Sequence, residues 1–446
     1  MTSTLLQQVR VIDPVSGIDQ IADVLIDNGY IMSVSTTISD IPNDTLVQDC
    51  HGLVLGPGLI DLYSYSGEPG HEERETLLSL MKAAAAGGFT RINILPDTSP
   101  AIDSPAIVAQ LLHKSCVGID DRTDLKDKLS VGSNLSTTSV TPSIAAPILN
   151  VWGAITQNVA GKQMTELADL AASGVVGFSD GQPWDNIGLV RRVLEYLQPL
   201  RKPIGIWCCD RELQGNGVMR EGLDAVHLGL PFIPYIAETA AIASVLEVVA
   251  TTNVPVHIMR VSTARSVELI ATAKANGLPI TASTTWMHLL LDTKTIKSYN
   301  ASLKLKAPLG NPKDLVALRQ AVKTGIIDAI AIDHSPYTYE EKTVAFAEAP
   351  PGAIGFELAL PLLWHYLVET GEFTAIELWK TLSTRPAECL QQKPSAIAQG
   401  QPAEMTLFDP QQSWKVEKQN LYTLSTNTPW LGQQLQGRVL KTWRQI

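Results

Sequence analysis

The middle of the chain alternates between short apolar segments and helical segments, and this alternation limits the fold more than any other feature. Eight apolar segments have the length and composition of strands, and a helix or loop follows each of them. Strands that alternate with helices form parallel sheets, and eight such units close into a barrel. We therefore predict an α/β fold with a (β/α)8 TIM barrel over residues 57–392. The expected strands are Leu59–Leu62, Thr90–Leu95, Ile148–Val151, Val175–Phe178, Ile204–Cys208, Val256–Val261, Leu278–Ala282 and Asp328–Ile332.

The expected helices lie between these strands. Gly87-Gly88 ends the first of them, as glycine commonly does after a helix. The segment Ser115–Leu129 is rich in Asp and Lys and has no apolar period, which predicts a solvated surface insertion. The expected helices are Glu72–Ala86, Pro105–Leu112, Gln163–Ala172, Asn186–Leu197, Ala237–Ala250, Ala264–Ala275, Pro312–Lys323, Phe356–Val368 and Ala375–Leu382.

Both ends of the chain have the pattern of strands and turns. Asn28-Gly29 predicts a tight hairpin, and Asp409-Pro410 predicts a turn. Two β segments that flank a long α/β region most simply form one composite domain. We expect residues 1–56 and 393–446 to form this small β domain. Its expected strands are Val9–Ile12, Ala22–Ile26, Glu404–Phe408 and Gln434–Trp443.

Composition excludes several classes of partner. With 446 residues, 45% of them hydrophobic, the chain can bury a large core. A formal net charge of -11 argues against a nucleic acid or an anionic membrane as the partner. The five cysteines are scattered without a CxxC pair, which favours reduced thiols. The N-terminus lacks a basic segment followed by an apolar run, and no segment approaches the length of a membrane span, so we expect a cytoplasmic protein.

The segment from Gly56 to Gly70 carries the chemistry that most needs explaining. Its strand should deliver side chains to the C-terminal mouth of the barrel, where catalytic groups of such folds lie. Residues i and i+2 of a strand share one face, so a His-x-His pair there would converge on one metal ion. Here those two positions hold Tyr63 and Tyr65.

Over nearly its whole length the chain resembles the dihydroorotases of the metal-dependent amidohydrolase superfamily. Each motif is weak alone, but their order along the chain matches that of the family. The motifs are Gly58-Leu59-Ile60-Asp61 with Glu68-Pro69-Gly70, Leu95-Pro96-Asp97-Thr98-Ser99-Pro100, Val176-Gly177-Phe178-Ser179-Asp180-Gly181, Val261-Ser262-Thr263-Ala264, Ile332-Asp333-His334-Ser335-Pro336, Ala349–Glu357, Ser383–Ala387 and Ala403–Asp409.

The resemblance implies where the family's functional residues would fall. The four metal-binding histidines fall on Tyr63, Tyr65, Trp207 and Arg260. Only carboxylates remain of the metal site: Asp333, the family's metal ligand and proton shuttle, and Asp180, next to which the family has a second aspartate that is absent here. The implied substrate-pocket positions are Gly67, Asp97, Met287 and Tyr337.

These substitutions predict that the family mechanism fails. The family uses zinc to make a hydroxide available near neutral pH and to polarise the carbonyl of a cyclic amide. Indole only donates hydrogen bonds, guanidinium stays protonated, and phenol ionises near pH ~10. We therefore expect no metal cofactor and interpret Asp333 as a vestigial catalytic residue.

Arg260 is expected to replace the lost cations. Without metal, Asp180 and Asp333 would be buried negative charges, which are costly unless they are paired. We predict that Arg260 forms an ion pair with Asp333 or Asp180, and that Tyr63, Tyr65 and Trp207 fill the remaining volume.

Other candidate ligands are expected to be structural. Strand parity places His257 on the face opposite to Arg260, as a core or helix-facing histidine. The same parity allows at most one of Cys208 and Cys209 to face the site. His288 and His334, close to strand ends, are expected to serve in structural hydrogen bonding.

Three functions remain open at this point. The first is a dihydroorotase homologue of pyrimidine biosynthesis that has lost catalysis and acts as a binding or scaffolding protein. For it the resemblance implies aspartate carbamoyltransferase as a partner, and a homodimer as the assembly. The second is an active cyclic-amide hydrolase, of dihydroorotase or hydantoin/allantoin type, with an altered metal site on Asp180, Asp333 and a cysteine. The third is a small-molecule sensor that uses the remodelled mouth.

Overall fold

Eight short parallel strands follow one another in chain order around the centre of the protein. The computed structural model describes residues 3–117 and 145–444. Within them, the strands form two hydrogen-bonded groups of four, which a bridge between Phe178 and Ile204 joins. All eight expected barrel strands are confirmed. They are β6 (Leu59–Ile60), β7 (Phe89–Ile94), β8 (Ile148–Gly153), β9 (Gly177–Phe178), β10 (Gly205–Trp207), β13 (Val256–Met259), β14 (Ile280–Thr285) and β15 (Ala329–Ala331).

Hydrogen bonds beyond β6 and β15 close the ring. The backbone N–H of Asp333 donates to the carbonyl of Tyr63 at 3.1 Å, and Tyr65 donates to His334 at 2.8 Å. The buried carboxylate of Asp61 accepts the backbone N–H of Ile332 at 2.9 Å. Burial raises the pKa of Asp61 to about 7, although its hydrogen bonds oppose the rise. The first and last strands are therefore held together by backbone and side chain.

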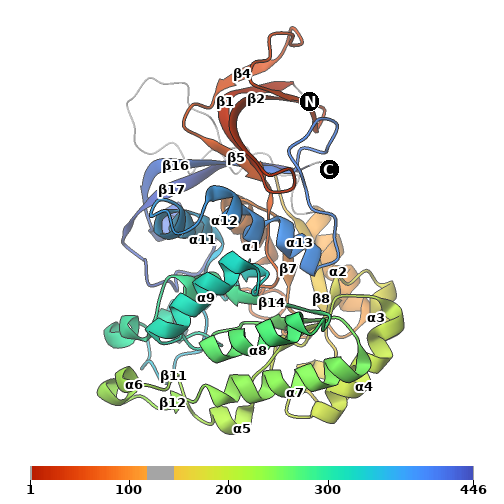
Figure 1. Cartoon of the computed structure of the whole chain (residues 1–446), viewed down its shortest axis with the longest axis vertical. Helices are drawn as coiled ribbons and strands as arrows, with labels where there is room; N and C mark the ends of the chain where they lie inside the picture. Colours follow the sequence, from red (N-terminus) through yellow and green to blue (C-terminus); the bar gives the residue numbers. More distant parts are fainter. Residues whose placement is uncertain (1–2, 118–144, 445–446) are drawn as a thin grey trace.

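Helices cover the outside of these strands, as Figure 1 shows. α8 and α12 have the predicted bounds, whereas α1 begins at Leu77, five residues after the expected start. Thr76 caps α1 because its hydroxyl accepts the N–H of Ser79. The covering helices are α1 (Leu77–Ala86), α2 (Pro105–Val117), α3 (Leu167–Ala172), α4 (Ile187–Leu197), α7 (Ile236–Thr252), α8 (Ala264–Ala275), α9 (Pro312–Thr324), α11 (Phe356–Leu363) and α12 (Ala375–Leu382).

Short elements occupy the connections between strands and helices. α11 continues into a π-helical turn, η6 (Trp364–Val368), so the predicted single helix changes its hydrogen-bond pattern. A small insertion between β10 and α7 holds two helices and a two-stranded sheet. The short elements are α5 (Arg211–Gln214), β11 (Met219–Arg220), α6 (Leu223–Leu228), β12 (Phe232–Ile233), α10 (Tyr339–Lys342), α13 (Thr384–Cys389), η1 (Gln157–Val159), η2 (Gln198–Leu200), η3 (Trp286–Leu289), η4 (Thr293–Ser298), η5 (Ala301–Leu303) and η7 (Lys418–Asn420).

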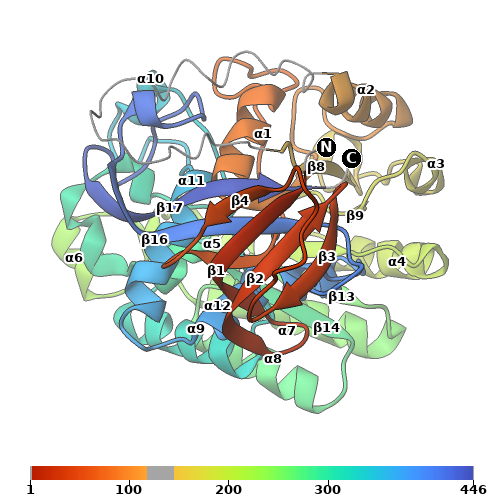
Figure 2. The ribbon, with the colours of Figure 1, turned by 90° about the horizontal axis from the view of Figure 1, so that it is seen from above.

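Strands from both ends of the chain form one sheet beside the barrel. Its order is β17-β16-β5-β1-β2-β3, and β4 pairs with β1. Figure 2 shows β1, β2 and β3 crossing above β16 and β17. The strands are β1 (Thr4–Asp13), β2 (Ile18–Asp27), β3 (Tyr30–Ser35), β4 (Leu46–Asp49), β5 (Val54–Pro57), β16 (Met405–Lys415) and β17 (Gln434–Trp443).

The two predicted turns of this sheet have different outcomes. Asn28 and Gly29, with φ values of 49° and 79°, join β2 to β3 and confirm the predicted hairpin. The predicted turn at Asp409-Pro410 is wrong, because both residues lie inside β16. The register with β17 shifts between Asp409 and Ser413, and the Asp409 carboxylate accepts the N–H of Gln411 at 2.8 Å. The turn signal therefore corresponds to a bulge within the strand.

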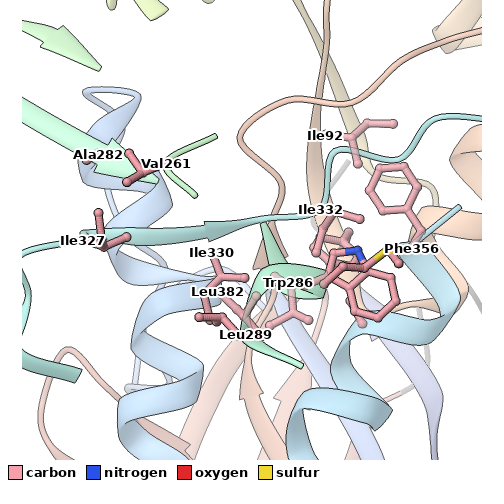
Figure 3. Close-up of a cluster of buried hydrophobic side chains, with 14 of the residues drawn as sticks. Ile92, Val261, Ala282, Trp286, Leu289, Ile327, Ile330, Ile332, Phe356 and Leu382 are labelled. Carbon is pink, nitrogen blue, oxygen red and sulfur yellow. The ribbon is translucent and has the colours of Figure 1, made fainter. Parts of the chain in front are cut away.

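Among the described residues, the apolar core has three clusters. The largest lies between strands and helices, and Figure 3 shows part of it, with Ile330, Ile332 and Phe356 among the labelled side chains. A second contains Ile60, Met259 and other residues of the barrel strands, and a third fills the composite sheet. Gly87 allows α1 to approach α11 closely, since a Cβ at this position would overlap the carbonyl of Phe356.

An ion pair joins the barrel to the segment that leads into β16. Arg91 donates to the Glu404 carboxylate through Nε at 2.8 Å and Nη2 at 2.7 Å. The two side chains are only 14% and 11% exposed. Burial alone would raise the pKa of Glu404, but Arg91 outweighs this effect and lowers it.

Two further sequence-based expectations concern the surface insertion and membrane spans. Most of the expected surface insertion Ser115–Leu129 lies outside the described residues, and residues 115–117 belong to α2. Among the described helices, none is long and apolar enough to cross a bilayer.

Replacing Arg91 with alanine should lower the free energy of unfolding by about 3 kcal/mol, because Glu404 would remain a buried charge without its partner. Arg10, whose pair with Asp19 is more exposed, is the control. Its replacement with alanine should cost less than about 1 kcal/mol. Urea unfolding followed by tryptophan fluorescence measures both values. Equal losses in the two variants would contradict this account of the junction.

Candidate functional site

Arg260 lies directly after β13, at the mouth of the barrel. Its backbone has a φ of 56°, in the left-handed region that non-glycine residues rarely adopt. The strand has ended at Met259, so the alternation of faces along β13 does not extend to Arg260. Asp333, which follows β15, also has a positive φ, of 52°. Both side chains are therefore positioned by unusual backbone conformations at strand ends.

Arg260 and Asp333 form a two-pronged ion pair. Nε of Arg260 donates to Oδ2 of Asp333 at 2.8 Å, and Nη2 donates to Oδ1 at 2.7 Å. The Arg260 side chain is 0% exposed and that of Asp333 is 13% exposed. A planar guanidinium matches a carboxylate in this geometry, which gives both strength and orientation. The predicted ion pair is confirmed, and its partner is Asp333.

Three aromatic side chains enclose the guanidinium. Its Cζ lies 5.0 Å from the ring centroid of Tyr63, 5.6 Å from that of Tyr65 and 4.9 Å from that of Trp207. Aromatic faces attract cations at these distances. The predicted packing of the three rings around the barrel mouth is confirmed.

Nη1 and Nη2 of Arg260 make further polar contacts. Nη2 also donates to the Tyr65 hydroxyl at 2.8 Å, and Nη1 donates to the carbonyl of Gly181 at 3.2 Å. Although burial alone would lower the pKa of Arg260, the Asp333 carboxylate and the tyrosines outweigh it and raise that pKa well above its usual value. Burial also raises the pKa of both Tyr63 and Tyr65. The site is thus a buried cation, a carboxylate and two neutral phenols.

His257 has a different position from the one that strand parity predicts. Its Nε2 lies 2.8 Å from the hydroxyl of Ser283, and that hydroxyl lies 2.9 Å from the hydroxyl of Tyr63. The Tyr63 hydroxyl also accepts the backbone N–H of Arg260 at 3.1 Å. The prediction of opposite faces was wrong, because β13 ends before Arg260. The prediction of a buried core histidine is confirmed, and burial lowers the pKa of His257 to about 3.

Asp180 is near the site but directs its carboxylate elsewhere. The carboxylate accepts the backbone N–H groups of Ile155 and Thr156 at 2.8 and 3.0 Å, and the Thr156 hydroxyl at 2.5 Å. Burial raises the pKa of Asp180 to about 6 despite these bonds. The neighbouring residue Gly181, rather than Asp180, contacts Arg260. Asp180 therefore holds the loop after β8.

Lys306 connects Asp97 to the aromatic group. Its Nζ lies 3.6 Å from the centroid of the Tyr65 ring and donates to Oδ2 of Asp97 at 3.3 Å. Gln182 donates to the same oxygen at 2.9 Å. Burial raises the pKa of Asp97 and lowers that of Lys306, and the attraction between the two opposes both shifts. Sequence reasoning missed Lys306, because no motif marks a lysine distant in the chain from its partner.

The other implied substrate positions, all within the described residues, form no hydrogen bond or ion pair with Arg260. A side chain at Gly67 would overlap the backbone carbonyls of His71 and Glu75, so this loop leaves no room for one. Met287 in η3 is buried and lines a small void that Asp333 also lines. Tyr337 lies between two cations, with the Cζ of Arg74 and the Nζ of Lys342 each 5.0 Å from its ring centroid.

The remaining histidines and cysteines have structural contacts. His288 bonds Thr285 at 2.7 Å through Nδ1, and His334 accepts the N–H of Gly355 at 3.1 Å. Their predicted structural roles are confirmed. Cys209 belongs to the same apolar cluster as Trp207, whereas Cys208 belongs to the cluster between strands and helices, as parity predicts. The four cysteines whose side chains the structure describes are free thiols.

The donors at the barrel mouth do not fit a zinc ion. Both Asp333 oxygens accept hydrogen bonds from Arg260, and the two phenols would have to ionise against a raised pKa. Burial raises the pKa of the Cys209 thiol to about 12, which disfavours the thiolate that metals bind. Across residues 3–117 and 145–444, no three His, Cys, Asp or Glu side chains are grouped so as to hold a metal ion.

Double-mutant analysis of Arg260 and Asp333 should show strong coupling. Arg260→Met and Asp333→Asn should each lower the free energy of unfolding by about 3 kcal/mol, because each leaves the other charge buried and unpaired. In the double variant, the free energy of unfolding should fall by clearly less than the sum of the losses in the two single variants. Thermal and urea unfolding measure the cycle. The exposed pair Arg265–Glu268 is the control and should show coupling of less than about 1 kcal/mol. Additive losses at Arg260 and Asp333 would show that the pair does not compensate buried charge.

Comparisons with known proteins place this chain in a family. The Amidohydrolase family profile matches residues 44–445. A "Probable dihydroorotase-like protein" from Synechocystis sp. is 43% identical over 443 residues, covering 97% of this chain and 98% of that protein. A "Dihydroorotase" from Pelobacter propionicus is 35% identical over 439 residues, covering 98% and 97%.

Solved structures agree on the fold. An L-hydantoinase (dihydropyrimidinase) from Arthrobacter aurescens covers 100% of this chain and 95% of its own, with a TM-score of 0.81 and 18% identity. A dihydropyrimidinase from Brevibacillus agri covers 100% and 94%, with a TM-score of 0.78 and 19% identity. At these identities the likeness concerns the fold alone. The family profile and the full-length relatives give the assignment: this chain belongs to the amidohydrolase family and is a dihydroorotase-like member of it.

Proposed function

We propose that this protein is a dihydroorotase homologue that has lost metal binding and catalysis and acts as a binding or scaffolding protein in pyrimidine biosynthesis. The observation that supports this most directly is the ion pair between Arg260 and Asp333. A cation built into the chain compensates the carboxylate that would otherwise hold a metal and move a proton. The aromatic rings of Tyr63, Tyr65 and Trp207 fill the space around it.

The chemistry of cyclic-amide hydrolysis supports the same conclusion. The reaction needs an activated water and a base that can accept its proton. Asp333 accepts two charge-assisted hydrogen bonds from a permanently charged guanidinium, so both of its carboxylate oxygens are already engaged. Tyr63 and Tyr65 stay neutral near pH 7 because burial raises the pKa of each. Within residues 3–117 and 145–444, the side chains that contact Arg260 are therefore poorly suited to take a proton from water.

The partner is the second part of the proposal. The resemblance to dihydroorotases implies aspartate carbamoyltransferase as the protein that this chain would support. We place this function in the cytoplasm, with a homodimer as the assembly. A scaffold needs an intact fold and surface but no reaction centre, which is consistent with a guanidinium and aromatic rings at the positions of the family's metal ligands.

The metal and catalytic parts are tested together. The protein as purified should contain far less than one zinc per chain by plasma emission spectroscopy. It should not hydrolyse dihydroorotate, with or without added zinc. The Pelobacter propionicus dihydroorotase, prepared in the same way, is the positive control. Stoichiometric zinc or zinc-dependent turnover would overturn the loss of catalysis and favour the active hydrolase with an altered metal site.

The scaffolding part is tested separately. Aspartate carbamoyltransferase from the same organism should elute with this protein in size-exclusion chromatography, in a complex larger than either alone. The active Pelobacter propionicus dihydroorotase, mixed with the same transcarbamoylase, shows whether association is particular to this chain. Separate elution across the accessible concentration range would refute this partner and would leave the result on metal and catalysis unaffected.

A further inference from the structure

A cavity of about 360 Å³ opens beside Trp207 at the mouth of the barrel. This volume lies within the range of small-molecule sites. None of the substrate-pocket positions implied by the family resemblance lines it, and neither Asp333 nor Arg260 does. The lining residues are Gln182, Pro183, Trp207, Arg211, Gln214, Gly215, Gly217, Val218, Ile233, Lys304, Leu305, Lys306 and Pro351.

The charge of this cavity is opposite to that of the protein as a whole. Its lining includes Arg211, Lys304 and Lys306 but no Asp or Glu, in a chain of formal net charge -11. Field lines concentrate in a cleft lined by one sign of charge, which raises the local concentration of the opposite ion. The lining therefore favours an anion.

The three cations are only partly compensated. Lys304 donates to the backbone carbonyl of Ala347 at 2.7 Å, and within the described residues it forms no ion pair. Arg211 pairs with Asp185 at 3.3 Å, but both side chains are largely exposed, so this contact is weak. Lys306 pairs with Asp97 at 3.3 Å from behind the cavity wall. Burial lowers the pKa of Lys304 and of Lys306, and a bound anion would raise both pKa values again.

A buried arginine with unused donors lies behind the same wall. Arg220 is 1% exposed, and its Nη2 donates to the hydroxyl of Ser262 at 2.6 Å and to the carboxylate of Glu238, its ion-pair partner, at 3.4 Å. Its Nε and Nη1 have no hydrogen-bond partner among the described residues. Arg220 lines a small void that shares Trp207 and Lys306 with the larger cavity. Buried donors without partners are rare, so a water beside them would be favoured. The carboxylate of Glu238 lines the same small void and disfavours an anion inside it, so an anion belongs in the larger cavity.

The rest of the lining suits a flat organic body. Apolar surface comes from Trp207, Val218, Ile233 and Leu305, and Gln182 and Gln214 supply amide groups. Ligand sites commonly combine apolar walls with a few polar groups that fix the orientation.

We propose that this cavity binds a small organic anion, an aromatic carboxylate or phosphate monoester, with its charged group toward Lys304, Lys306 and Arg211. The flat body of the ligand packs against Trp207 and Ile233. The site is independent of the proposed function, because its cations are outside the Arg260–Asp333 pair and would bind an anion whether or not the barrel hydrolyses a cyclic amide.

Calorimetric titration with matched ligand pairs tests the charge requirement. Benzoate is compared with benzyl alcohol, and phenyl phosphate is compared with phenol. The first pair tests binding of a carboxylate, and the second tests binding of a phosphate. At least one anion should bind, and its neutral counterpart should bind at least about tenfold more weakly. Added salt should lower the affinity for the anion. Equal binding of anion and neutral counterpart, or no binding of either anion at millimolar concentration, would overturn the proposal.

Two variants locate the site. Lys304→Gln and Arg211→Gln should each lower the affinity for the anion by about tenfold, because each removes a charged donor from the lining. Lys162→Gln removes an exposed lysine that is not part of the lining and should leave binding unchanged. Thermal unfolding of all three variants checks that they fold. Folded variants that bind as tightly as the unaltered protein would show that the anion binds elsewhere and would refute the assignment.

Discussion

The compensation of buried charge by Arg260 and Asp333 is the constraint on which the rest of the barrel mouth depends. An isolated carboxylate at this depth would be strongly unfavourable, and a paired one is tolerated when its oxygens are fully used. Arg260 uses them both, and its remaining donors reach Tyr65 and Gly181. Aromatic rings then surround the guanidinium without leaving its charge unpaired. Both oxygens of Asp333 and the hydroxyls of Tyr63 and Tyr65 are thus hydrogen-bonded to neighbouring residues.

This arrangement requires precise backbone positions at strand ends. Arg260 and Asp333 both have left-handed φ values, and each costs some conformational energy. The cost is tolerated because hydrogen bonds from Asp333 and Tyr65 close the ring of strands at the same level. Asp61 adds a buried side-chain contact to the last strand. The closure of the barrel and the ion pair thus stabilise each other, while the cationic cavity beside Trp207 remains open.

Much of the fold could be predicted because local patterns report it. Eight strands appear where apolar segments alternate with helices, and the Asn28-Gly29 hairpin forms because its residues favour a positive φ. The sequence-based predictions were wrong where one local pattern is compatible with two different structures. Asp409-Pro410 disrupts a strand, and only its pairing with β17 makes the disruption a bulge rather than a turn. Parity misplaced His257 relative to Arg260, because it assumes that the strand continues, and β13 ends at Met259.

The sequence by itself determined the alternation that builds the barrel, the membership of both ends in one sheet, and the residue types at the site: two tyrosines, a tryptophan and an arginine beside two carboxylates. Tertiary structure decided which carboxylate Arg260 pairs with, that Asp180 instead holds the loop after β8, and that Lys306 reaches Asp97 from 209 residues away. The physical reason is that charge pairing depends on distance and burial. Both are set by how the strand ends converge, and neither is encoded in any one segment.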